Sequence, residues 1–211
     1  SYILMKTIKV EHSEIMSILI EAIIHSQQCT MEGKLCNVEK GWSLVNNENR
    51  PDKIIISSKI SKSLKEYVKK EKLDYYKALR LTICLAEQIG ALNEMGLSIS
   101  HIEPSDILVL SENWYLITNT DNILPLEKDK INIIKPVHKS MFTSPEMSNI
   151  NTLPTAIDHR SSYYSIALVV LFSLGLKKDN KDIEKLYPTS LYFLLQRCLQ
   201  RSPSDRVLLL V

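Results

Sequence analysis

Polar and apolar residues alternate over residues 2–10, where Lys6 and Lys9 stand between β-branched and other apolar side chains. This period of two predicts a half-buried strand. After Ser13 the apolar residues recur at helical spacing, at Ile15, Ile18, Leu19, Ala22 and Ile23. The stripe predicts an amphipathic helix that ends near Gln28 and that Ser13 caps at its N-terminus.

Two shorter apolar runs follow at residues 42–45 and 54–60, and the stretch 46–52 between them is rich in turn-forming residues. These runs predict the two strands of a hairpin. The spacing of apolar residues then becomes helical again. It predicts a short helix from Leu64 and a long one over residues 75–95. The long helix has one apolar face, formed by Leu81, Leu85, Ile89 and Leu92.

The second half of the chain is predicted to be mainly helical. A tight hairpin interrupts it, with strands at residues 107–110 and 114–118 joined by three polar residues. Residues 164–174 are apolar nearly all round, which indicates a helix buried on every side. Residues 191–199 form the last clear helix. Together these elements predict an α+β fold.

Length and charge narrow the possible classes of protein. The 211 residues suffice for one good hydrophobic core, and a formal charge of +2 arises from basic and acidic residues that alternate along the chain. Since there is no basic stripe, nucleic acid is not an expected partner. The longest apolar run, residues 166–172, is far shorter than the roughly twenty residues of a membrane span. We therefore expect a soluble protein.

The cysteines give no sign of a metal or redox centre. Cys29, Cys36, Cys84 and Cys198 have spacings that match neither a zinc site nor a CxxC pair. We expect them to be reduced thiols, which indicates a cytoplasmic location. No metal ion and no cofactor is expected.

Four segments share a pattern with a known family, and they follow one another in the same order. Residues 99–109, ISHIEPSDILV, resemble the protein-kinase catalytic loop H-R-D-L-K-P-x-N-I-L-V. Residues 143–146 resemble the A-P-E that ends the activation segment, and residues 162–167 resemble the D-x-W/Y-S-x-G of the central helix. Residues 198–206 resemble a C-L-x-x-D/S-P-x-x-R motif. The predicted elements also follow the order in a protein kinase from its third strand onward.

The resemblance implies a kinase-like α+β fold. Residues 1–62 would form a reduced N-terminal β lobe, and residues 63–211 a mostly helical C-terminal lobe. Glu146 and Arg206 fall where kinases keep a structural ion pair between the activation segment and the C-terminal helices.

The front of the chain carries the weaker part of the resemblance. Residues 3–6 resemble the V-A-I-K strand, so Lys6 would be its lysine and Glu21 its partner in an ion pair, with Lys9 as a competing register. None of the five glycines forms a G-x-G-x-x-G loop, so nothing visible would hold ATP phosphates.

In this alignment with the catalytic loop, the residues at the catalytic positions differ from those of an active kinase. His101 replaces the base Asp, and Glu103 replaces the Lys that neutralises the transferring phosphate. Asn119 replaces the magnesium-binding Asp of D-F-G, and a neutral amide is a poor ligand for this hard ion. Asp106 replaces the loop Asn and could still hold a metal. The resemblance therefore implies an inactive kinase homologue without catalytic residues, which acts by binding a protein.

Two alternatives stay open at this point. The chain could be a weak kinase or an atypical nucleotidyl transferase that uses His101 and Asp106. It could also be a scaffold built on the helical lobe alone, although the strands expected at residues 2–10 and 54–60 argue against this.

A finer resemblance suggests a branch of the family. The segment 63–67, the Tyr163-Tyr164-Ser165 version of the central helix and Ser144-Pro145-Glu146 are similar to the tyrosine-kinase-like branch, and more loosely to the pseudokinase domain of the mixed lineage kinase domain-like proteins. The many Lys, Ile and Asn residues would suit a poxviral copy. This resemblance implies viral mimicry in the host cytoplasm, in which the chain binds an active host kinase of the receptor-interacting type and inhibits necroptosis.

Overall fold

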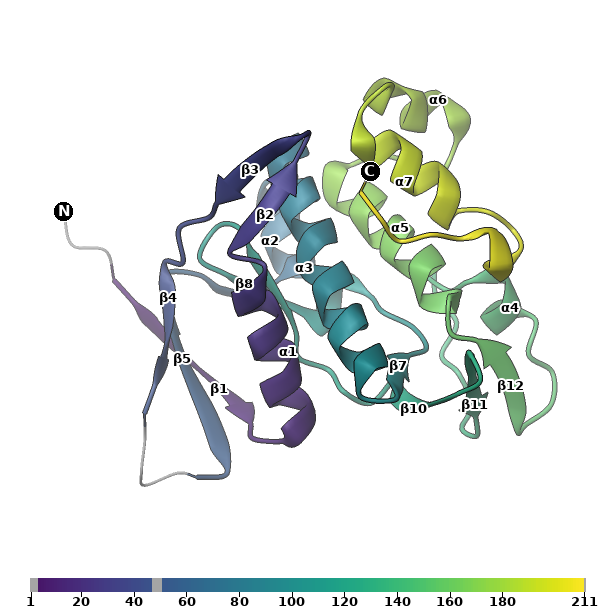
Figure 1. Ribbon diagram of the computed structural model, residues 1–211, viewed down its shortest axis with the longest axis horizontal. Coiled ribbons are helices and arrows are strands. Elements are labelled where there is room, and N and C mark those ends of the chain that lie inside the picture. The colour runs from purple at the N-terminus through teal and green to yellow at the C-terminus, as the bar shows by residue number, and fades with distance from the viewer. Residues whose placement is uncertain (1–3, 47–50, 211) are drawn as a thin grey trace. The chain divides into compact units, whose positions relative to one another are not determined.

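The computed structural model describes residues 4–46 and 51–210 (Figure 1). Within these residues the chain is α+β, with seven α-helices and four small antiparallel sheets. The α+β class expected from the hydrophobic pattern is therefore confirmed. The beginning of the first expected strand, Tyr2 and Ile3, and most of the turn between the next two strands lie outside the described residues.

The chain is organised as two compact units. The first consists of Ser1–Ala91 and Pro104–Thr120, and the second of Leu92–Glu103 and Asp121–Val211. The sequence-based boundary at residue 62 therefore lies inside the first unit. Strand pairing crosses this boundary, because β6 (Ser61–Ser63) pairs with β8 (Ile107–Leu110) and so joins residues on both sides of it.

The main sheet of the first unit contains the three strands that alternation and apolar runs predict. They are β1 (Lys6–Glu11), β4 (Trp42–Val45) and β5 (Lys53–Ser58), and β5 lies in the middle. Both pairings are antiparallel, with Ile8 opposite Ile56 and Leu44 opposite the same residue.

A second hairpin in this unit was not predicted from the sequence. Its strands are β2 (Gln28–Met31) and β3 (Lys34–Asn37). The two residues between them, Glu32 and Gly33, both have positive φ, at 50° and 77°. Such turns match the twist of paired strands and favour Gly at the second position. The Glu-Gly pair was thus the signal for this hairpin.

Three helices belong wholly or mostly to the first unit, namely α1 (Glu14–His25), α2 (Leu64–Lys70) and α3 (Tyr75–Glu94). The hydroxyls of Ser13 and Ser63 cap α1 and α2 by accepting from Met16 N at 3.1 Å and Glu66 N at 3.2 Å. The buried stripe of α1, which includes Leu19, faces strand β9 (Trp114–Ile117).

The small sheet β6-β8-β9 packs beside α3, and a buried side chain satisfies its last strand. Gln88 of α3 donates to Tyr115 O at 2.9 Å and accepts from Ile117 N at 2.8 Å. These are the backbone groups that a further strand would otherwise pair, so Gln88 closes the edge of β9.

Arg80 of α3 is the largest cation in the interior of the first unit, and it has no exposed surface. Its guanidinium donates to Ser26 O at 2.9 Å and to Asn113 O at 3.0 Å. It also lies 4.8 Å from the ring centre of Trp114, where a cation–π contact adds to its stability. Arg80 thus joins the end of α1, the β8–β9 turn and α3.

The second unit contains a four-stranded antiparallel sheet in the order β12-β11-β10-β7. Its strands are β7 (Leu97–Ile99), β10 (Ile123–Glu127), β11 (Lys130–Ile133) and β12 (Thr155–Asp158). A buried cluster of Ile131, Ile133, Met147 and Ile157 covers one face. The expectation of a mainly helical second half is thus corrected, because these strands are too short to give a clear period in the sequence.

Helix α5 (Ser161–Leu174) is buried along most of its length, and both Val169 and Val170 are wholly buried. A helix apolar all round needs protein on every side. The other helical segments are α4 (Pro145–Ser148), α6 (Asn180–Ile183) and α7 (Ser190–Cys198), with single 3₁₀ turns at Glu184–Leu186 and Pro203–Asp205. In the part of the chain that the structure describes, no helix has both the length and the apolar character needed to cross a membrane.

The role of Arg80 leads to a stability prediction. Arg80→Ala leaves two buried carbonyls without donors and removes a cation–π contact, so we expect the free energy of unfolding to fall by about 3 kcal/mol. Lys69→Ala, an exposed position on α2, is the control and should change it by less than about 0.5 kcal/mol. Urea unfolding followed by circular dichroism measures both. Equal stability of the two variants would contradict the role given to Arg80.

Candidate functional site

The positions that the resemblance assigns to catalysis occur as two pairs, one in each unit. Asp106 and Asn119 belong to the first unit, and His101 and Glu103 belong to the second. In each pair the two side chains lie next to each other.

Asp106 ends a single 3₁₀ turn, Pro104–Asp106, that leads into β8. Its carbonyl accepts from Thr118 N at 2.9 Å, which brings Asn119 beside it at the end of β9. The Asn119 amide Nδ2 donates to Asp106 Oδ1 at 2.9 Å, and Asp106 is only 7% exposed. The carboxylate and the amide at these positions therefore bind each other.

His101 is buried, with 5% of its surface exposed. Its Nδ1 lies 3.4 Å from Ser165 Oγ, and its Nε2 lies 3.6 Å from Glu103 Oε1. Ser165 donates its own hydroxyl hydrogen to Phe142 O at 2.6 Å, so its oxygen is left to accept from Nδ1. This assigns the Nδ1–H tautomer to His101.

Ser165, His101 and Glu103 together supply a hydroxyl, an imidazole and a carboxylate, the groups of a hydrolase triad. In a triad, however, the hydroxyl is open to the substrate. Ser165 has no exposed surface, and its hydrogen is already donated to a carbonyl. His101 Nε2 is buried and has no hydrogen-bond partner among the described residues, since 3.6 Å exceeds hydrogen-bond length. The trio holds the loop in place and offers no nucleophile.

Glu146 and Arg206 form the ion pair that the resemblance implied. Arg206 Nη2 donates to Glu146 Oε1 at 2.9 Å, and Nη1 donates to Oε2. The three remaining N–H groups donate to main-chain carbonyls, those of Arg160 at 3.1 Å, Arg201 at 3.0 Å and Gln200 at 2.8 Å. All five guanidinium donors are thus used.

Lys6 and Glu21 are both exposed, and no ion pair joins them in the described ranges 4–46 and 51–210. The expected pair is absent because α1 turns its Leu19 face inward, which leaves Glu21 toward solvent. Lys9, the competing register, is exposed as well. The structure therefore gives no support for a nucleotide-binding lysine at the front of the chain.

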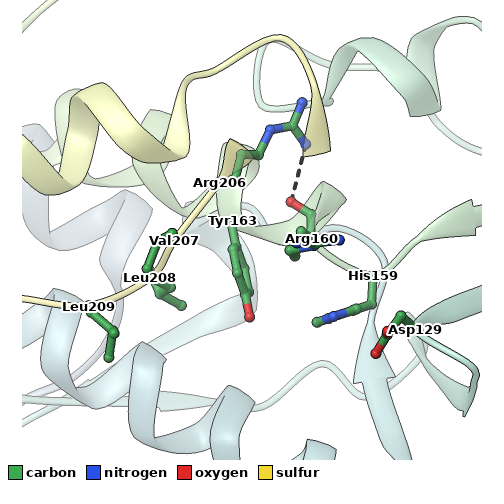
Figure 2. Close-up of a pocket in the computed structure, with 8 residues that line it drawn as sticks. All are labelled: Asp129, His159, Arg160, Tyr163, Arg206, Val207, Leu208 and Leu209. Atoms are coloured by element: carbon green, nitrogen blue, oxygen red, sulfur yellow. Dashed lines mark hydrogen bonds between the residues drawn. The ribbon is translucent and has the colours of Figure 1, made fainter. Parts of the chain in front are cut away.

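A pocket of about 410 Å³ lies in the second unit beside Arg206, and sequence reasoning gave no indication of it (Figure 2). Val207, Leu208 and Leu209 form an apolar wall on one side, and His159 with Asp129 lies on the other. Tyr163 stands between them, with its ring edge-on to that of His159 at 5.8 Å. Arg160 and Arg206 complete the lining.

Two titratable groups of this pocket, His159 and Tyr163, favour their neutral forms. Burial lowers the pKa of His159, with Asp158 opposing the change and Arg160 adding to it. Burial also raises the pKa of Tyr163. Arg160 in turn is paired with Asp158 at 2.9 Å. The pocket can therefore offer apolar contact and neutral hydrogen-bonding groups, while the guanidinium groups of Arg160 and Arg206 are paired with carboxylates of the protein.

In the described parts of the chain, no group of three or more His, Cys, Asp or Glu side chains could hold a metal ion. No model of a known protein family matches the chain, and no curated protein matches its sequence significantly.

The Glu146–Arg206 pair gives a second stability prediction. Glu146→Gln leaves the buried Arg206 charge without its counter-ion, so we expect a loss of about 2 to 3 kcal/mol in the free energy of unfolding. The control is the pair of Asp182 with the exposed Lys185, where Lys185→Ala should cost less than about 0.5 kcal/mol. Urea unfolding compares them, and a Glu146→Gln variant as stable as the control would refute the role of the pair.

His159 gives a pH prediction. Its pKa in the folded state lies below the ordinary value of 6.5, so the unfolded chain binds the proton more readily. The stability linked to His159 is therefore present above pH 6.5 and is lost as the pH falls below it. Unfolding measured at several pH values between about 7.5 and 5 should show a smaller loss in His159→Gln than in the unchanged protein. Parallel curves for the two proteins would contradict the prediction.

Proposed function

We propose that the chain is a pseudokinase, a protein-kinase-like fold without phosphotransfer activity, and that it works by binding another protein. The order of its elements supports this proposal, from β1 and α1 through the long α3 and the β8–β9 hairpin to the buried α5. The bidentate pair of Glu146 and Arg206, at the two motif positions expected to form it, supports it further.

The observation that carries the proposal is the burial of His101, at the position of the catalytic base. A general base must come within about 2.6 to 3.2 Å of the proton that it removes. Nε2 of His101 is enclosed and Nδ1 faces Ser165. A substrate hydroxyl reaches neither nitrogen while the loop keeps this conformation. The hydrogen bond from Asn119 to Asp106 acts in the same direction, since it engages a carboxylate oxygen that a metal would need.

The proposed partner is an active kinase. A chain that keeps the elements of the fold and loses the charges of catalysis retains a kinase-shaped surface, which suits sequestration or allosteric adjustment of a related enzyme. The looser resemblance to the mixed lineage kinase domain-like proteins makes the finer form of the proposal a viral decoy in the host cytoplasm, bound to a receptor-interacting kinase and inhibiting necroptosis. The weak kinase or nucleotidyl transferase that would use His101 and Asp106 is the less favoured function, because both side chains are engaged within the protein.

Partner binding is tested with purified components. The immobilised chain is exposed to a panel of active kinase domains that includes receptor-interacting kinases, and bound protein is measured by surface plasmon resonance. We expect saturable binding to at least one kinase domain and none to an unrelated protein of similar charge. If the chain bound none of the kinases in the panel, this result would count against the proposal.

Nucleotide binding is tested separately by thermal shift. Since Lys6 and Glu21 form no ion pair in the described ranges and Asn119 already engages Asp106, we expect ATP with magnesium to leave the melting temperature unchanged. A ligand at a hundred times its dissociation constant would stabilise the folded state by about 2.7 kcal/mol, which such a measurement detects readily. A magnesium-dependent rise would show that the altered positions still hold the nucleotide and its metal.

A further inference from the structure

The four cysteines differ sharply in their surroundings. Cys84 and Cys198 have no exposed surface, and burial raises the pKa of both thiols, that of Cys198 to about 12. Cys29 and Cys36 are half-buried instead. Because the thiolate is the reactive form and must be reached by its reagent, the second pair is the more open to chemistry.

Cys29 and Cys36 lie directly opposite each other in the β2–β3 hairpin. Opposed residues of an antiparallel pair share one face and have Cα atoms about 4.5 to 5.5 Å apart. A disulfide requires a Cα separation of about 4.4 to 6.8 Å. The backbone of the hairpin therefore already holds the two thiols at bonding distance, with only six residues between them in the chain.

The hairpin lies beside α3 (Figure 1) and contacts it at two places. Tyr75 donates its hydroxyl to Glu32 at the hairpin turn, and Arg80 Nη1 donates to Cys29 Sγ at 3.6 Å. The Tyr76 phenol lies nearby as well: burial raises its pKa, Arg80 opposes this rise, and the Cys36 and Cys29 thiols add to it. The Cys29 thiol thus contacts α3 through Arg80, and both thiols lie close enough to Tyr76 of the same helix to act on its pKa.

We propose that Cys29 and Cys36 are a dithiol modification site that a disulfide oxidant such as oxidised glutathione converts to an intramolecular disulfide. One cysteine thiolate attacks a sulfur of the oxidant and releases the first glutathione as thiolate. The opposing cysteine then attacks the mixed disulfide and releases the second. The two thiols lose two electrons and two protons, and one oxidised glutathione is reduced to two molecules of glutathione.

The bond links the strands at the point where the hairpin meets Arg80. It therefore restricts opening of the hairpin and leaves the buried cysteines unchanged. This effect is independent of kinase binding and of the loss of phosphotransfer.

The test uses the whole folded chain, oxidised glutathione and mass spectrometry without reduction. We expect the chain to lose two hydrogen atoms and to carry no glutathione. Trypsin cuts after Lys9, Lys34 and Lys40, so the disulfide should join the peptides 10–34 and 35–40. Cys29→Ser and Cys36→Ser should each stop at one stable mixed disulfide, whereas Cys84→Ala should behave as the unchanged chain does.

Hydrogen exchange gives an independent readout. Amides of residues 28–37 should exchange about tenfold more slowly after oxidation, and those of α7 should not change. Two results would overturn the proposal: mixed disulfides that persist on both cysteines, or a chain that stays fully reduced under conditions that oxidise a model dithiol peptide.

Discussion

A buried guanidinium must have its five N–H groups satisfied, and this requirement organises the second unit around Arg206. The five acceptors come from three places in the chain: Glu146 in α4, the carbonyl of Arg160 just before α5, and the carbonyls of Gln200 and Arg201 after α7. The guanidinium also lies 5.0 Å from the ring centre of Tyr164. Since an unpaired charge would be far too costly in this interior, these segments must converge for the unit to fold. Arg80 imposes the same kind of constraint in the first unit.

The positions that the resemblance assigns to catalysis also form their contacts within the protein. In each unit a polar side chain that would face a substrate in an enzyme contacts another protein group, Asn119 with Asp106 and His101 with Ser165. Such contacts stabilise the loops on which these residues lie, but they compete with any metal or substrate. On the proposed function, in which the chain binds a protein and transfers no phosphate, such contacts would help to keep the binding surface rigid.

The sequence predicts the elements whose pattern is long or strongly periodic. The α1 stripe, the long α3, the apolar α5 and the β8–β9 hairpin lie within a few residues of their expected bounds. The β2–β3 and β10–β11 hairpins escape prediction because their turns carry weak signals. Glu32 and Lys128 adopt positive φ without being glycine, and Pro125 lies inside β10, where proline argues against a strand.

The sequence likewise predicts part of the candidate site and misses the rest. Motif register alone selected Glu146, Arg206, Asp106 and Asn119, which the fold brings together in pairs. It could not foresee that Glu21 faces solvent, because the rotation of α1 depends on packing against β9. Nor could it find the pocket beside Tyr163, whose walls come from residues far apart in the chain, or the facing of Cys29 and Cys36, which follows from an unforeseen hairpin register.

The central claim is that phosphotransfer has been lost, and an assay with γ-labelled ATP, magnesium or manganese and a general protein substrate tests it most directly. The unchanged chain and a folded His101→Ala, Asp106→Ala double variant should transfer the same background amount of label. Incorporation by the unchanged chain that disappears in the double variant would contradict the account.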